Sequence, residues 1–244
     1  MKDRTRPNLK IIGNNSASGG QYSDVRIIGD GVVEGDVECI NFKSVGDSKI
    51  NGSVKADHLK TVGSISVEGS VESDSIAITG DLRSTGDIRM GDLRVKGGIT
   101  TKGSIKGDDV RLTGRVEVKN NCEGELFRLN GQLTIGGLLS ADDIDIKAYR
   151  RSRINEIGGD RIIVRKGPGI GRVIKSALAA AGFRSEMLEV NSIEGDEIRL
   201  EYTKAKVVRG KDIVIDGGCN IEIVEYKDSL RVHHGATVKQ KMKI

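Results

Sequence analysis

A glycine recurs every seventeen residues through the first 147 positions of this 244-residue chain. A second glycine column lies six residues further on and is broken only once, by Asn120, a residue type that tolerates a left-handed backbone. The first column is Gly29, Gly46, Gly63, Gly80, Gly97, Gly114 and Gly131, and the second is Gly35, Gly52, Gly69, Gly86, Gly103 and Gly137. A fixed period of this size is the signature of a stacked-repeat architecture.

Apolar residues keep the same period and alternate with polar residues inside each repeat. Ile65-Ser66-Val67 shows the alternation, which is typical of a strand with one buried face. Three apolar columns are Phe42, Leu59, Ile76, Leu93, Val110, Phe127 and Ile144; Val37, Val54, Val71, Ile88, Ile105, Cys122 and Leu139; and Val33, Ile50, Val67, Ser84, Thr101, Val118 and Ile135. One coil cannot bury its own inner face, but stacked coils can. The sequence therefore predicts an all-β parallel β-solenoid, with several short strands in each coil and glycines at the corners.

Two regions are expected. Residues 1–147 form a regular solenoid with a thin N-terminal cap, because residues 14–20 are small and polar. Residues 148–244 form a less regular segment in which the stretch 157–162 is echoed at offsets of 36, then 15, then 16 residues, with an insertion at about 166–184. The chain closes with lysine at every second position from Lys239 to Lys243, a pattern that discourages strand pairing at a sheet edge.

Composition argues against most kinds of small-molecule site. The chain has no Trp and only 4 Tyr and 3 Phe, too few to line an aromatic cleft. The turn at Gly167–Gly171 matches neither the dinucleotide-binding fingerprint nor the P-loop fingerprint. His233 and His234 are adjacent and are expected to point to opposite faces of a strand, so they cannot easily bind one metal ion. Asp residues that follow corner glycines, such as Asp87, are expected to bond their own backbone rather than calcium. We expect no cofactor, no metal, no nucleic acid partner and no small-molecule substrate.

Cysteine and charge give further constraints. Cys39, Cys122 and Cys219 lie far apart and are expected to be buried, reduced thiols of a cytoplasmic protein. No signal peptide or membrane-length apolar run is expected in the chain. Net charge is unevenly distributed: residues 148–244 carry 19 Lys and Arg against 13 Asp and Glu, a net of +6. An anionic partner is therefore expected to meet that region.

The insertion has the pattern of an amphipathic helix with a basic rim. It could pack on the solenoid, dock a partner, or lie on the anionic inner face of the cell membrane. Because the outward solenoid positions have mixed charge, any membrane contact is expected from the insertion and not from the solenoid. The candidate contact residues are Lys166, Ile170, Arg172, Val173, Ile174, Lys175, Leu178, Phe183 and Arg184.

Coils such as Val67-Glu68-Gly69-Ser70-Val71 followed by Ile76-Ala77-Ile78-Thr79-Gly80 resemble those of the bactofilins, the polymer-forming bacterial cytoskeletal proteins. The resemblance covers residues 9–147 strongly and 148–244 loosely. It implies a right-handed β-helix that assembles end to end without nucleotide. It also implies a scaffold role in cell shape, wall synthesis, polarity or motility, with the chain itself, or a related bactofilin, as partner.

Three function classes are weighed. The leading hypothesis is a non-enzymatic, self-associating scaffold, because a solenoid has two ends with unpaired strand edges. A monomeric adaptor that binds proteins along its faces is the second. A hexapeptide-type acyltransferase is the third; the six-residue spacing occurs only once per repeat, and His58 stands alone.

Overall fold

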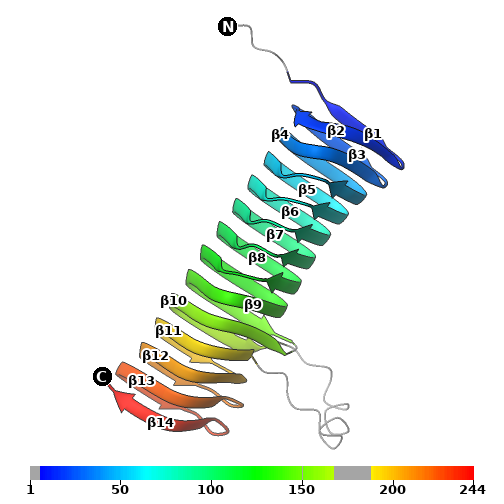
Figure 1. The fold of residues 1–244 in the computed structure, drawn as a ribbon. Coiled ribbons are helices and arrows are strands. Elements are labelled where there is room, and N and C mark those ends of the chain that lie inside the picture. The colour runs from blue at the N-terminus through cyan, green and yellow to red at the C-terminus, as the bar shows by residue number, and fades with distance from the viewer. Residues whose placement is uncertain (1–5, 150, 168–187) are drawn as a thin grey trace, which may run out of the picture. The chain divides into compact units, whose positions relative to one another are not determined.

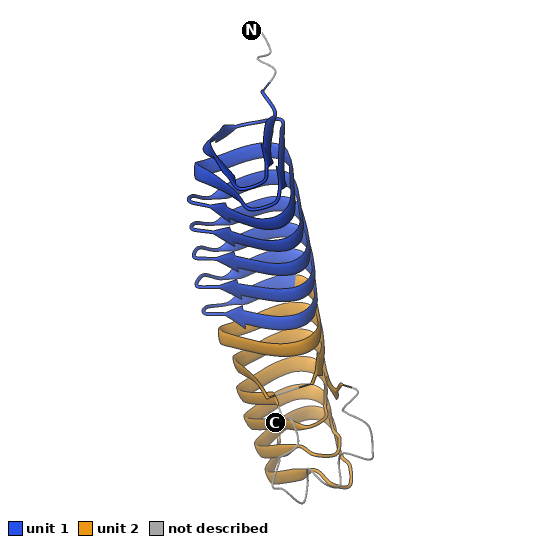
Figure 2. Ribbon diagram, turned by 90° about the vertical axis from the view of Figure 1, so that its right-hand side faces the viewer, with its two compact units in different colours: residues 1–124 blue, residues 125–244 orange. Residues whose placement is uncertain are grey.

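The computed structural model describes residues 6–149, 151–167 and 188–244 of the chain, which divide into two compact units, 1–124 and 125–244 (Figure 2). Every described element is a β-strand (Figure 1). The strands that begin in the first unit are β1 (Leu9–Ile12), β2 (Asn15–Gln21), β3 (Asp24–Ile28), β4 (Gly31–Ile50), β5 (Val54–Val67), β6 (Val71–Ser84), β7 (Ile88–Thr101), β8 (Ile105–Val118) and β9 (Cys122–Ala148), of which β9 continues into the second. The remaining strands are β10 (Ser152–Lys166), β11 (Leu188–Leu200), β12 (Thr203–Ile215), β13 (Asn220–Val232) and β14 (Thr237–Lys243).

In the first unit the coils pair in parallel, at an offset of sixteen residues for β1 with β3 and of seventeen from β3 onward. From β4 to β8 the register is constant, as Phe42↔Leu59 and Leu59↔Ile76 illustrate. The three apolar columns predicted from the sequence are buried, and further columns between them are buried as well, such as that of Cys39 and Ala56. This confirms the parallel β-solenoid, because the core is built by stacking identical columns and not by packing separate layers.

The first glycine column bends the strand without ending it. Gly63 and Gly80 have φ of 117° and 129°, a region that L-residues rarely adopt, and they lie inside β5 and β6. A Cβ at Gly80 would also collide with the carbonyl oxygen of Gly63. Because backbone pairing continues through these corners, each regular coil contains one fourteen-residue strand. The expectation of several short strands per coil is therefore wrong.

The second glycine column serves a different purpose. Of the described residues in that column, only Gly35 has a positive φ, and Asn120 is not left-handed. At Gly86 a Cβ would approach the carbonyl carbon of Gly69 to 2.9 Å, so the position excludes side chains because two backbones meet there. The left-handed explanation for Asn120 is consequently wrong, and the close approach that explains Gly86 does not extend to Asn120, which carries a side chain.

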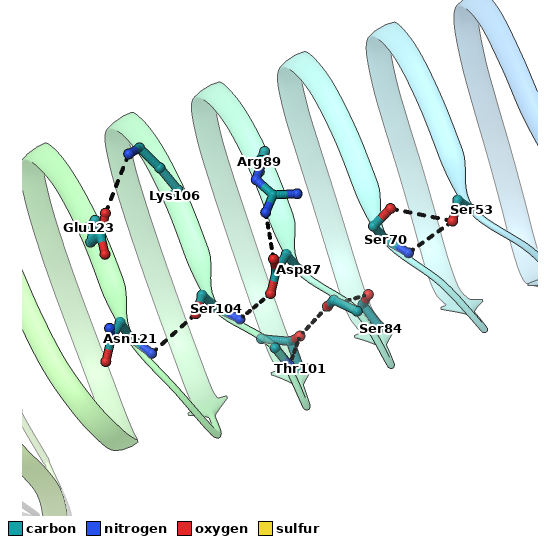
Figure 3. Close-up of polar contacts among 12 residues, drawn as sticks. Ser53, Ser70, Ser84, Asp87, Arg89, Thr101, Ser104, Lys106, Asn121 and Glu123 are labelled. Carbon is teal, nitrogen blue, oxygen red and sulfur yellow. Dashed lines mark hydrogen bonds and ion pairs between the residues drawn. The ribbon is translucent and has the colours of Figure 1, made fainter.

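Polar side chains next to this second corner form hydrogen bonds from coil to coil (Figure 3). The Ser53 hydroxyl accepts from the Ser70 backbone N–H at 3.2 Å, and the Asp87 carboxylate accepts from the Ser104 N–H at 2.9 Å. Ser104 in turn accepts from Asn121 at 3.4 Å. Asp87 therefore binds the backbone of the next coil and not its own, which corrects the expectation for this residue.

The second unit keeps the inward columns but varies the length of each coil. Ile157 pairs with Ile193, Ile193 with Val208, and Val208 with Val224, the offsets that the sequence echo predicts. The offset of 36 between β10 and β11 contains residues 168–187, so most of the predicted insertion lies outside the described residues. The predicted boundary at residue 147 remains a prediction.

Candidate interaction surfaces

The first coil offers an unpaired strand edge with almost no charge. Among the described strands, β1 pairs only with β3, and β2 only with β4. Its core-facing side is small and apolar: Ile11 is buried above Ile27, and Ala17 lies in the column of Val33. Residues 7–22 carry one charged side chain, Lys10. Free backbone donors and acceptors beside an apolar, uncharged surface are suited to pairing with another strand edge.

The last described strand is built differently. β14 pairs only with β13 among the described strands and places Lys241 in the column of Val224, a fully buried core residue. Lys239 lies 3.6 Å from the Glu222 carboxylate, and Lys243 follows Tyr226. A charged residue at the end of a core column is one of the devices that blunt a sheet edge. The predicted blocking pattern is thus present, with one of its lysines in the core register.

Of the predicted membrane or partner contacts, only Lys166 lies within the described residues. Its ammonium is 4.0 Å from the centroid of the Tyr202 ring, and its backbone N–H donates to the Glu201 carboxylate at 3.2 Å. Tyr202 has φ of 47°, the one described non-glycine residue with a positive value. The other predicted contacts fall outside the described residues: Ile170, Arg172, Val173, Ile174, Lys175, Leu178, Phe183 and Arg184.

The other titratable candidates are the three cysteines and His58. All three cysteines are free and buried, and burial raises the pKa of the Cys39 and Cys122 thiols to about 12 and that of Cys219 to about 11. The exposed His58 ring contacts the Ser75 hydroxyl at 2.9 Å. Within the described ranges, no group of three or more His, Cys, Asp or Glu side chains is placed to hold a metal ion, and no helix is suited to span a membrane.

A groove of about 600 Å³ with a mixed polar and apolar lining lies in the second unit, a feature that the sequence did not indicate. Asn155 accepts a hydrogen bond of 2.6 Å from Asn191 across the coils that line it, and Lys204 and Lys206 stand at its edge. The alternation of Lys204 and Lys206 along β12 was the signal that could have indicated this groove. It was not distinctive, because polar residues alternate with buried ones along the other strands as well. The lining also carries the Glu189 and Glu222 carboxylates, which pair with Arg153 at 3.2 Å and Lys239 at 3.6 Å.

Comparison with known proteins gives distant similarity and no family. No family model matches the chain, and no solved structure gives a significant match. Two uncharacterized proteins of Bacillus subtilis (strain 168) are similar: YhbF is 33% identical over 109 residues, which are 44% of this chain and 42% of YhbF. YhbE is 35% identical over 111 residues, 45% of this chain and 44% of YhbE. The match thus spans less than half of each relative, and the chain is a β-solenoid protein distantly similar to both.

Proposed function

We propose that this protein is a bactofilin-like structural scaffold of the cytoplasm that self-associates through the ends of its β-solenoid without nucleotide. The observation that carries the proposal is the first coil, which pairs on one side among the described strands, has apolar inward residues and carries one charged side chain, Lys10, in residues 7–22. Two such edges can pair with little repulsion, because each brings one lysine to the contact. A two-fold joint between first coils buries both edges at once.

Pairing between the β14 strands of two copies is expected to depend on ionic strength. Two β14 strands brought together place six lysines in one contact, three from each copy: Lys239, Lys241 and Lys243. At low ionic strength these cations repel, and at about 1 M salt the Debye length falls to about 3 Å and the repulsion is screened. The proposal therefore expects dimers at low salt and longer nonpolar filaments at high salt.

Charge inserted into the first coil tests the joint. Ala17→Lys places a cation in the core-facing column, whereas Ser16→Lys adds the same charge to the exposed neighbouring position. Sedimentation velocity of the full chain is expected to show a dimer for the parent and Ser16→Lys, and a monomer for Ala17→Lys. Equal sedimentation of the two variants would remove the first coil as the joint.

Two further measurements separate this scaffold from an adaptor or an enzyme. Lys241→Val restores an apolar residue to the Val224 column and should produce filaments at low salt, visible by negative-stain microscopy. Adding ATP or GTP with magnesium should leave the pelleted fraction unchanged. A parent protein that stays monomeric at every salt concentration would favour the adaptor hypothesis instead.

A further inference from the structure

One face of the first unit carries a column of cations beside a stripe of aliphatic side chains, of which three are exposed and Ile28 is half-buried. The two columns are two residues apart on the same strands, so both point outward with a buried residue between them. The paired registers align them from coil to coil through β1, β3, β4 and β5. The basic column is Lys10, Arg26, Lys43 and Lys60, and the aliphatic stripe is Ile12, Ile28, Val45 and Val62.

The aliphatic stripe is not explained by folding. At Thr61-Val62 the threonine is buried and the valine is 45% exposed, although the opposite order would suit a solenoid core. The next coil has that opposite order, with Ile78 buried and Thr79 exposed. The buried Thr61 hydroxyl finds no hydrogen-bond partner in the described part of the chain. Two coils therefore keep a polar residue inside and an aliphatic one outside, since Ser44-Val45 repeats the pattern with Val45 at 53% exposure.

The basic column is also unusual for this solenoid. None of its four cations forms an ion pair within residues 6–149, 151–167 and 188–244, although they lie one coil apart, and like charges opposite each other on neighbouring strands destabilise a sheet. Another outward column has opposite charges that pair across coils, as Lys55–Glu72 at 2.9 Å and Lys106–Glu123 at 3.5 Å. Unneutralised cations of one sign indicate an anionic partner.

Few acids oppose the column on its own face. The outward position before each cation is held by Asn8, Asp24, Asn41 and His58 in the four coils. Asp24 is the one carboxylate in this set, and it accepts a hydrogen bond of 2.9 Å from Asn41. Both columns are interrupted at the same coil, where Ala77 follows Lys60 and Thr79 follows Val62. Arg94 and Arg111 continue the basic column in the next two coils, whereas Lys96 and Thr113 follow Thr79 in the other column. Cations and aliphatic side chains therefore lie side by side in β1, β3, β4 and β5.

We propose that this face, formed by the basic column and the aliphatic stripe, docks on an anionic phospholipid bilayer. Lipid headgroup phosphates would meet the cations, and the aliphatic side chains, about 7 Å away along each strand, would enter the interfacial region. The aliphatic stripe favours lipid over nucleic acid, which is bound through cations and aromatic stacking, and this face has no aromatic residue in its outward columns. The docking requires one copy only and does not depend on end-to-end assembly.

This proposal replaces the expectation that the solenoid faces offer nothing to lipid. The mixed charge that supported that expectation is present further along the unit, where Arg89 pairs with Asp87 at 2.6 Å. In β1, β3, β4 and β5 the acids lie outside the basic column itself, in other outward columns such as that of Glu38 and Lys55. The sequence showed the cations and the aliphatic residues separately, and only the register brings them together.

Flotation of the full chain with vesicles tests the basic column. The parent should float with phosphatidylcholine vesicles that contain 30% phosphatidylglycerol, remain unbound with phosphatidylcholine alone, and dissociate as salt is raised. A quadruple variant of the basic column, with Lys10, Arg26, Lys43 and Lys60 changed to Gln, should weaken binding on the order of hundredfold. The matched control changes four ion-paired cations of other faces to Gln and should retain most of the binding: Lys49, Lys55, Arg89 and Lys106.

The aliphatic stripe has its own test. The double variant Thr61→Val/Val62→Thr keeps the composition, buries the apolar residue and removes Val62 from the surface. It should raise the thermal midpoint and lower vesicle affinity several-fold, whereas Ile40→Thr, which alters an aliphatic residue 44% exposed on another face, should not change affinity.

Three outcomes would overturn the proposal. If the quadruple variant and its control lose vesicle binding equally, the binding depends on net charge and not on this face. Binding to a DNA duplex without binding to anionic vesicles would assign the face to nucleic acid. Flotation that survives both face variants and disappears on deletion of residues 168–183 would assign membrane contact to the insertion.

Discussion

The regular coils β5–β8 and the coils β10–β13 solve the same packing problem with different backbones. In β5–β8 the coil length is constant, and every first-column glycine, such as Gly97, has a positive φ. In β10–β13 the offsets vary, and Gly195 has no positive φ, although a Cβ there would collide with the carbonyl oxygen of Gly159. Both regions keep inward apolar columns and close approach of backbones at glycine.

This difference teaches which part of the repeat is essential. Coil length varies in the second unit, and the register shift between Gly210 and Asp212 shows where an extra residue is absorbed. Side-chain columns do not vary, since Ile162, Ile198 and Ile213 remain stacked and buried. The essential feature is therefore the inward column together with the glycine contact, and the fixed period is one way of maintaining them.

The strongest test of the comparison is Gly97→Ala in the first unit. The substitution forces an L-residue to a φ of 139° and drives its Cβ into the carbonyl oxygen of Gly80. The strained backbone alone costs about 1–3 kcal/mol, so the urea midpoint should fall clearly. Gly98→Ala is the control, because its Cβ meets only the movable Asp81 carboxylate. Similar midpoints for the two variants would mean that the corner tolerates side chains.

Gly195→Ala asks whether close approach alone is sufficient in the second unit. Its Cβ would strike the Gly159 carbonyl and lie 2.9 Å from Ile162 Cδ1, without any demand on φ. Overpacking of this kind costs about 1–3 kcal/mol, so the loss should be smaller than for Gly97→Ala. The comparison fails if Gly217→Ala, where the nearest atom lies at 3.5 Å, destabilises equally in thermal melts.

Two buried threonines should respond in opposite directions. The Thr101 hydroxyl donates to the Gly86 carbonyl at 2.6 Å and accepts from the Gly103 N–H at 3.0 Å, whereas the Thr61 hydroxyl has no partner in the described residues. Thr101→Val should lower stability by about 1–2 kcal/mol, and Thr61→Val should raise it by about 1 kcal/mol. Calorimetric midpoints that move in the same direction would contradict this assignment.

The smallest expected effect concerns the thiols. In native protein at pH 8, Cys39, Cys122 and Cys219 should react with a disulfide reagent far more slowly than in urea, because burial raises their pKa and blocks access. Cys219 should react first, since it lies close to the terminal strand and its pKa is the least raised. Mass spectrometry of timed aliquots gives the order, and early labelling of Cys122 would show that the first unit opens locally.

Sequence was sufficient for the fold and for the stacking register. Periodic columns such as Leu59 and Ile76 specify both, because the same residue that is buried also identifies its partner one coil away. The register of the second unit was equally accessible through echoes such as Ile193 and Val208. The sequence could not show why each glycine is needed. A positive φ and a close backbone contact both require glycine, so the two causes look the same in the sequence.

The candidate surfaces were predicted only in part. Lys239 and Lys243 were recognised from their alternation, but the position of Lys241 in a core column required the pairing of β13 with β14. The face formed by the basic column and the aliphatic stripe was missed because its members lie 16 or 17 residues apart. The net charge of a stretch of sequence sums the cations of this column with the acids of other faces, so the column does not stand out.

The constant offset of β4–β8 has a consequence for heredity. Because each coil pairs through the same positions, a deletion or duplication of seventeen codons leaves every remaining partner in register. A change of another size keeps the inward columns only where the extra or missing residue is absorbed by a register shift, as between Gly210 and Asp212 in the second unit. Deletions and duplications of whole coils therefore change the length of this unit in steps of about 4.8 Å, and selection can act on that length.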